Sequence, residues 1–382
     1  MRHRSILRIA AAGMFAFAIA MGIGRFAFTP LLPIMQKDAG LTLSMGAWLA
    51  VANYLGYLAG ALAAIWIRIR AALMLRGVLI AVVVLTAAMG STHDPALWLA
   101  LRGLAGIASA WGLIFASAAI LPRLAAAGKQ HLSGVVFGGV GLGMILAGAA
   151  CLFAARAGWS SDETWWLLAA IAAVLTVLGW PADEDASERK PAVASTRDLS
   201  DGADGRTRIE VVLCYGVFGF AYIVPATFLP AMARRAVADP AIFGWAWPVF
   251  GAAALVSTLL AARLFSEISN RRLWAAGHLV MAVGVVLPLV WPSIGGIIAA
   301  SVFVGGTFMV VTLAGLQEGR RIAPQDPTRL IAGMTTAFAT GQILGPILIG
   351  AFGGSATGLR VSLMVAAMSL VISALVLLRR RS

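Results

Sequence analysis

Residues 20–35 read Ala-Met-Gly-Ile-Gly-Arg-Phe-Ala-Phe-Thr-Pro-Leu-Leu-Pro-Ile-Met, which places Arg25 inside an otherwise apolar run. As a helix, the apolar segment 6–35 would be about 45 Å long, which exceeds the roughly 30 Å hydrocarbon thickness of a bilayer. We therefore expect it to span a membrane. An ionised group at that depth costs at least about 2.5 kcal/mol, so Arg25 should face a bundle interior or a water-filled cavity. Alternatively, it reaches the outer headgroups or binds a carbonyl freed by Pro30.

The composition indicates a polytopic membrane protein. Of 382 residues, 60% are hydrophobic and only 12% are charged, against roughly 25% charged residues in soluble domains. The basic start Met1–Arg4 also fits a cleavable signal peptide, but the apolar run is about twice the usual length of a signal-peptide core, so we expect an uncleaved first span. Cys151 and Cys214 fall near opposite faces of the membrane, so neither a disulfide nor a metal site is predicted.

Hydropathy and the Gly, Pro and charge punctuation predict an all-α protein with twelve transmembrane helices. The expected spans are 6–35, 44–67, 71–89, 95–122, 130–155, 163–180, 208–232, 241–264, 272–290, 294–319, 329–352 and 360–378. With the N-terminus inside, 22 of the 29 basic residues lie in inner segments and 5 in outer ones, and Arg25 and Arg102 make up the rest. This asymmetry predicts a multi-pass protein of the inner membrane with both termini in the cytoplasm. It also explains the net charge of +13 without nucleic acid as a partner.

The segment 181–207 divides the chain into two parts of six spans each. It is long, polar and charged, so we expect a disordered cytoplasmic linker between an N-terminal half, 1–180, and a C-terminal half, 208–382. The two halves share local patterns at nearly constant offsets: Leu32–Met35 recurs as Leu229–Met232, and Gly106 recurs as Gly305. Such echoes favour parallel repeats with a substrate site between them.

The chain resembles the major facilitator superfamily over its whole length. Three local patterns support this resemblance: Arg102–Gly106 in the fourth span, Gly341–Gly350 with its Gly-Pro pair in the eleventh, and Gly60 with Arg68 around the second connection. The fifth span has Ala147 where family antiporters carry proline, and the second connection lacks the family's Asp. More narrowly, Met21–Met35 is similar to the first span of the YbfB/YjiJ-type transporters. The resemblance implies two six-helix pseudo-repeats and alternating access.

The candidate binding residues are polar groups near the middle of the predicted spans. Arg102 lies at a depth close to that of Arg25, and in the resembled fold both spans line the central cavity. No Asp or Glu falls in the middle third of any span, so we expect two uncompensated guanidinium groups facing a substrate. Alternatively, Arg102 only joins spans through backbone carbonyls. The repeat offsets pair Arg25 with Tyr222 and Arg102 with Ser301. The other candidates for substrate contact are Asn53, Tyr57, Trp111, Thr307, Thr340 and Gln342.

A second group of residues is expected to set helix packing and gating. Its members are Gly60, Arg68, Gly106, Gly341, Gly345 and Pro346, because glycine permits close helix approach and proline removes a backbone donor. Glu318 is a candidate for proton coupling. The four histidines are not accompanied by a nucleophile or a metal motif, so we expect neither an enzyme nor a cofactor.

These observations predict a secondary active transporter that moves a small organic solute by alternating access. An organic anion is favoured, since an uncompensated positive potential attracts anions and raises the barrier for cations. Export is favoured by the resemblance. Two alternatives stay open: an exporter of neutral or hydrophobic drug-like compounds, and a channel or membrane-embedded sensor. We expect a monomer in the lipid bilayer.

The topology can be checked with single cysteines introduced between residues 181 and 207. They should react only from the cytoplasmic side, as should tags on either terminus, because this segment is predicted to be an inner loop. Labelling of this segment in intact cells by an impermeant thiol reagent would contradict the number of spans.

Overall fold

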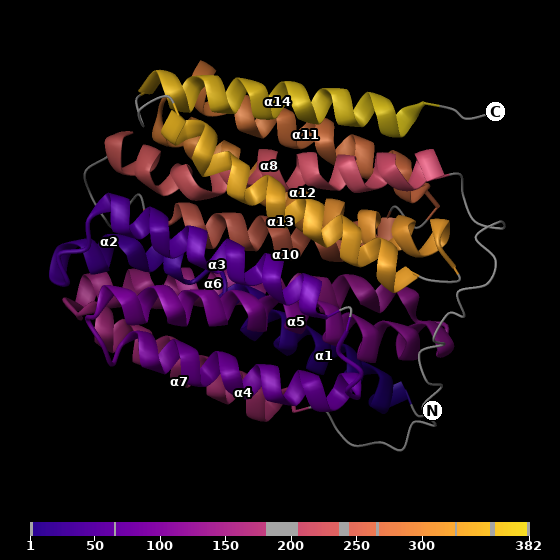
Figure 1. Cartoon of the computed structure of the whole chain (residues 1–382), viewed down its shortest axis with the longest axis horizontal. Coiled ribbons are helices and arrows are strands. Elements are labelled where there is room, and N and C mark those ends of the chain that lie inside the picture. Colours follow the sequence, from indigo (N-terminus) through magenta and orange to yellow (C-terminus); the bar gives the residue numbers. More distant parts are fainter. Residues whose placement is uncertain are drawn as a thin grey trace.

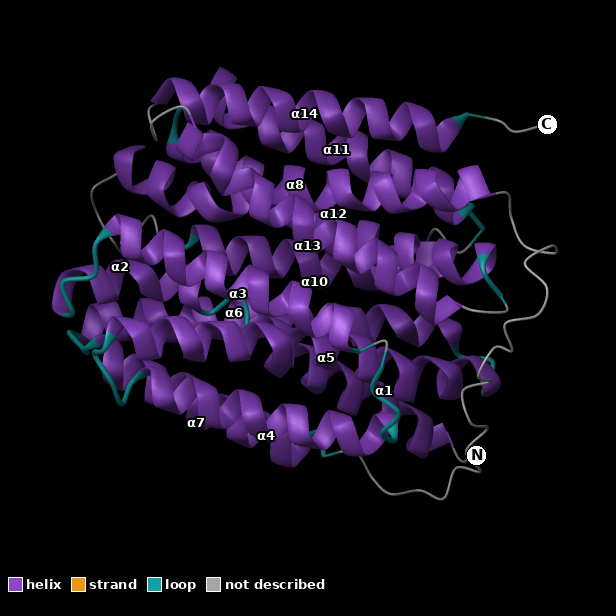
Figure 2. Cartoon of the chain, in the orientation of Figure 1, coloured by secondary structure: helices purple, strands orange, loops and turns teal. Residues whose placement is uncertain are grey.

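The computed structural model describes residues 3–64, 66–180, 205–236, 244–264, 267–324, 327–351 and 356–379. Within these ranges the chain folds almost entirely into helices, without a strand (Figure 2). Ten of the described helical segments are long and apolar enough to cross a membrane, and α10 contributes a shorter apolar helix, Ala246–Ala261. The predicted all-α membrane architecture is thereby confirmed.

The first span is built from three pieces in place of one continuous helix. They are α1 (His3–Phe17), the π-helix η1 (Ala18–Ile23) and α2 (Phe28–Asp38). The remaining spans of the N-terminal half are α3 (Leu43–Ala63), α4 (Ala71–Met89), α5 (Pro95–Ala126), α6 (Ser133–Ala157, after the 3₁₀ turn η2, Gln130–Leu132) and α7 (Ser161–Leu178). Those of the C-terminal half are α8 (Gly205–Ala236), α10 (Ala246–Leu264), α11 (Asn270–Val290), α12 (Ile294–Ile322), α13 (Pro327–Ala351) and α14 (Ala356–Leu378). Together they make twelve helical segments in the described chain, which match the twelve predicted spans in order, and ten of them meet the length and hydropathy expected of a membrane span.

The predicted linker lies mostly outside the described residues. Residues 181–204 are not described, and α8 begins at Gly205, three residues before the predicted boundary of the C-terminal half. In Figure 1 the helices before this gap lie on one side of the bundle and those after it on the other, with α10 and α13 along the boundary. Helix α1 begins and α14 ends at the same end of the bundle.

The two halves meet along two helix pairs. Helix α6 packs against α10, and α3 packs against α13. Helices α4 and α7 pack together at the edge of the N-terminal half, and α11 and α14 do so in the C-terminal half. The broken first span lies between α5 and α6, which places the break in the interior.

Glycine allows the backbones of several helix pairs to approach closely. A methyl group added at Gly106 of α5 would lie 2.1 Å from the carbonyl oxygen of Asn53 in α3, and one at Gly60 would lie 2.9 Å from Ile107 O. At the boundary between the halves, a methyl group at Gly141 of α6 would lie 2.5 Å from Gly251 O of α10. Such approaches place polar backbone and facing side chains at fixed distances across helix interfaces.

The packing of Gly106 generates a matched test in the same half of the protein. Gly106→Ala should lower the melting temperature of the purified protein, because the methyl group overlaps backbone that cannot move aside, and overpacking costs about 1–3 kcal/mol. Gly77→Ala in α4 is the control, since no atom lies within 4 Å of the added methyl group. Equal melting temperatures for the two variants would show that Gly106 is not a packing point.

Candidate functional site

The hydrogen-bond pattern of the first span changes over residues 19–31. The N–H of Gly24 binds Ile19 O, five residues back, at 2.8 Å, and that of Arg25 binds Met21 O, four residues back, at 3.3 Å. Neither N–H group therefore binds Ala20 O. Farther along, Pro30 has no N–H for Phe26 O, and the N–H of Thr29 binds that carbonyl at 3.2 Å. The N–H of Thr29 therefore does not bind Arg25 O, which would accept it in a regular α-helix. The break therefore releases backbone carbonyls in the interior of the bundle.

Helix α5 supplies side-chain donors to these carbonyls. The Ser109 hydroxyl donates to Ala20 O at 2.6 Å. The Arg102 guanidinium donates through Nη1 to Gly24 O at 3.3 Å and through Nη2 to Arg25 O at 3.1 Å. Residues 102 and 109 are two helical turns apart and so lie on one face of α5. The arginine that binds carbonyls at the break is thus Arg102, whereas Arg25 is the residue that the break positions.

The Arg25 side chain is 2% exposed and reaches across to the C-terminal half. Its Nη2 donates to Oε1 of Gln342 in α13. The guanidinium carbon lies 3.8 Å from the ring centroid of Tyr57 in α3, a cation–π contact. Its Nε and Nη1 are buried and have no hydrogen-bond partner among the described residues. A charged side chain with two free donors is a suitable ligand for a carboxylate.

The facing groups of the C-terminal half also carry unused polar atoms. Gln342 is fully buried, and its Nε2 has no partner within the described part of the chain. The Tyr222 hydroxyl of α8 lies beside Gln342 without a hydrogen bond of normal geometry. The Tyr222 ring stacks on Phe308 at 4.6 Å between centroids. Three side chains from two halves therefore present donors to one buried place.

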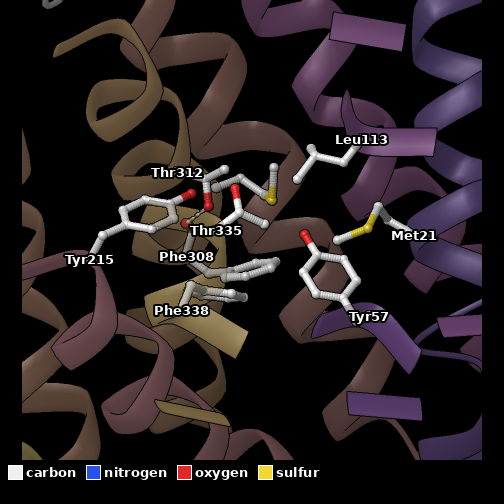
Figure 3. A pocket seen from close by; sticks show the side chains of 9 residues that line it. Met21, Tyr57, Leu113, Tyr215, Phe308, Thr312, Thr335 and Phe338 are labelled. Carbon is white, nitrogen blue, oxygen red and sulfur yellow. Dashed lines mark hydrogen bonds between the residues drawn. The ribbon is translucent and has the colours of Figure 1, made fainter. Parts of the chain in front are cut away.

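A small pocket lies between the halves (Figure 3), and Tyr57, which contacts Arg25, is part of its wall. Its N-terminal wall is Met21, Tyr57 and Leu113. Its opposite wall consists of Tyr215, Phe308, Met309, Thr312, Thr335 and Phe338. In this conformation it has room for about one water molecule. The side chains that line this pocket therefore nearly fill it.

The site has a positive charge without an internal counter-ion. Neither Arg25 nor Arg102 forms an ion pair with a carboxylate in the described structure. The buried Glu318, at 1% exposure, accepts two hydrogen bonds of 2.8 Å from Arg321 of the same helix. That carboxylate is therefore neutralised by its own partner.

Several residues predicted to contact the substrate lie away from Arg25 or form hydrogen bonds only to backbone carbonyls of helices. Asn53 donates to Arg102 O at 3.0 Å, and Trp111 donates to Gly60 O at 2.9 Å, so both join α3 to α5. Thr307 binds Phe303 O of its own helix at 2.7 Å. Thr340 is exposed and binds Thr336 O, on the side of α13 opposite to Gln342. The structure thus brings together Arg25, Tyr57, Tyr222 and Gln342.

The predicted packing and gating residues are spread over both halves. A methyl group at Gly341 would lie 2.3 Å from Gly216 O of α8, and one at Gly345 would lie 2.5 Å from the Ile223 side chain. Arg68 is exposed in the connection from α3 to α4. The side chain of Pro346 lies outside the described part of the chain.

Sequence reasoning missed Ser109 and most of the pocket. Ser109 carried one readable signal, since it follows Arg102 by seven residues on the same helix face. Phe308 and Phe338 looked like ordinary apolar residues of their spans. Only the packing of α8, α12 and α13 shows that they line a pocket beside a charge.

The comparisons with known proteins agree with this architecture. A family model described as "uncharacterised MFS-type transporter YbfB" matches residues 17–378. No curated protein matches the chain. The family match covers nearly the whole sequence and confirms the resemblance found from it. The protein therefore belongs to the YbfB family of MFS-type membrane transporters.

Proposed function

We propose that this protein is a secondary transporter for a small organic anion, which it exports across the bacterial inner membrane. The family supports the transporter class. The observation that supports an anionic substrate is the buried guanidinium of Arg25. Its Nε and Nη1 have neither a hydrogen-bond partner nor a carboxylate among the described residues. A carboxylate would accept parallel hydrogen bonds from such a group.

The mechanism that follows is competition for Arg25. In this conformation its Nη2 binds Gln342 Oε1, which joins the first span to α13 across the boundary between the halves. A carboxylate is a stronger acceptor than an amide oxygen, so a bound anion displaces Gln342 from Arg25. The halves are then held together through the substrate, and rocking about the site exposes it to one side or the other.

The remaining features of the proposal rest on the sequence. The excess of basic residues in the predicted inner loops supports cytoplasmic termini, and the beginning of α1 and the end of α14 at one end of the bundle agree with this topology (Figure 1). The resemblance favours export. We propose a monomer, with the bilayer and the solute as its partners and with no nucleic acid.

A second candidate is export of neutral, apolar compounds, which the apolar walls of the pocket favour.

A channel or a sensor is the alternative of another class. Flux of radiolabelled organic acids into proteoliposomes against a gradient separates these functions. Concentrative uptake supports the transporter, whereas passive equilibration indicates a channel and binding without flux indicates a sensor.

Arg25 and Arg102 should respond differently to the same substitution. Arg25→Gln should reduce organic-anion flux at least tenfold with little change in melting temperature, because it removes a charged hydrogen bond of about 1.5–3 kcal/mol to the substrate. Arg102→Gln should lower the melting temperature, because a buried carbonyl without a donor costs about 1–3 kcal/mol.

Arg25→Lys supplies the matched control for charge. It keeps the positive charge but loses the bidentate geometry, so its flux should fall between those of wild type and Arg25→Gln. A folded Arg25→Gln protein that transports anions at the wild-type rate would refute the proposed role.

A further inference from the structure

We infer that the substrate is a monocarboxylate with a compact apolar body, preferably an aromatic one. This inference rests on the proposed function, because it describes what occupies the same site. It depends on two observations: the number of guanidinium groups that remain available at the site, and the chemistry of the pocket beside Arg25.

One arginine, not two, is available for a substrate. Both terminal nitrogens of Arg102 donate to the carbonyls of the break. Its guanidinium carbon also lies 4.8 Å from the ring centroid of Phe28. Arg102 keeps one unpaired buried donor, Nε, whereas Arg25 keeps two, Nε and Nη1, and stands beside the free Nε2 of Gln342. A second carboxylate on the substrate would be buried without a guanidinium free to pair with it, which is unfavourable.

The pocket is contiguous with Arg25. Tyr57 contributes its ring both to the cation–π contact with Arg25 and to the pocket wall. Tyr222, beside Gln342, stacks on Phe308 and Phe338, which line the opposite wall. A carboxylate bound at Arg25 therefore places the rest of a small acid against these rings.

The pocket offers little to a polar body. Its walls are formed mainly by Met, Leu, Phe and Tyr side chains (Figure 3). The Thr335 hydroxyl donates to Ile331 O at 2.8 Å, and that of Thr312 donates to Phe308 O at 3.0 Å. The Tyr215 hydroxyl lies near Thr312 (Figure 3). A polyhydroxylated acid would lose its hydration and find the Tyr57 hydroxyl as its main polar partner in the wall (Figure 3), whereas an aromatic acid gains ring contacts.

The test measures binding of four probes to the purified full-length protein in nanodiscs by calorimetry. The probes are 3-phenylpropanoate, its neutral amide, terephthalate with a second carboxylate, and gluconate with a polar body. We expect 3-phenylpropanoate to bind at least tenfold more tightly than each of the other three. Lengthening the apolar chain of the monoacid by one methylene should tighten binding by up to about fourfold.

Two substitutions at Leu113 test recognition of the apolar body of the acid independently of recognition of its carboxylate. Leu113→Asn should weaken binding of 3-phenylpropanoate about tenfold and leave gluconate unchanged, because it makes the pocket wall polar. Leu113→Met keeps an apolar wall and should bind as wild type does. The probe series on the wild-type protein tests the inference even where a variant does not fold.

The failure of this inference is distinguishable from that of the proposed function. If 3-phenylpropanoate, terephthalate and gluconate bind equally well and none of them binds to Arg25→Gln, the inference of an apolar monocarboxylate is wrong. The proposal of an anion transporter is then unaffected. If no acid binds, or if Arg25→Gln binds the acids as wild type does, both proposals fall.

Discussion

The structure of the site depends on the need of buried backbone carbonyls for donors. Inside a membrane no water satisfies them, so the first span can depart from the α-helix only where another helix provides hydrogen bonds. Helix α5 does so with Ser109 and Arg102, two turns apart. The break is tolerated for this reason, and it places Arg25 at the boundary between the halves. Close glycine packing supports it: a methyl group at Gly22 of η1 would lie 2.4 Å from Gly143 Cα of α6.

The site is chemically asymmetric across the boundary between the halves. The N-terminal half supplies the charge of Arg25, and the C-terminal half supplies the amide of Gln342, the Tyr222 hydroxyl and stacked rings. Under the proposed mechanism the halves separate at this meeting point, so the Arg25–Gln342 hydrogen bond would break in that step. Binding an anion in place of Gln342 would therefore connect recognition to the motion of the halves.

The sequence allowed the helical class and the near-complete set of spans to be predicted, because charge and hydropathy are local properties. It also placed Arg25, Tyr57, Tyr222 and Gln342 among the candidate binding residues, and the structure brings these four together. For Arg102 it left two roles open, substrate contact and the joining of spans through backbone carbonyls, and favoured the first. Equal depth of two arginines suggested equal exposure to a cavity, but only the geometry of the break shows that one guanidinium is occupied by carbonyls. The π-helix was missed for a related reason, since the apolar pattern through Ala18–Ile23 continues without interruption. The pocket depends on contacts between spans that are far apart in the sequence.

The most direct test of the central claim, that Arg25 is a buried charge awaiting an external carboxylate, is to supply that carboxylate internally. Gln342→Glu places it where Gln342 Oε1 already accepts from Arg25. The account predicts a higher melting temperature and at least tenfold weaker binding of organic anions, whereas Gln342→Met, which removes the competing acceptor, keeps that binding. A folded Gln342→Glu protein that binds organic anions with wild-type affinity would contradict the account.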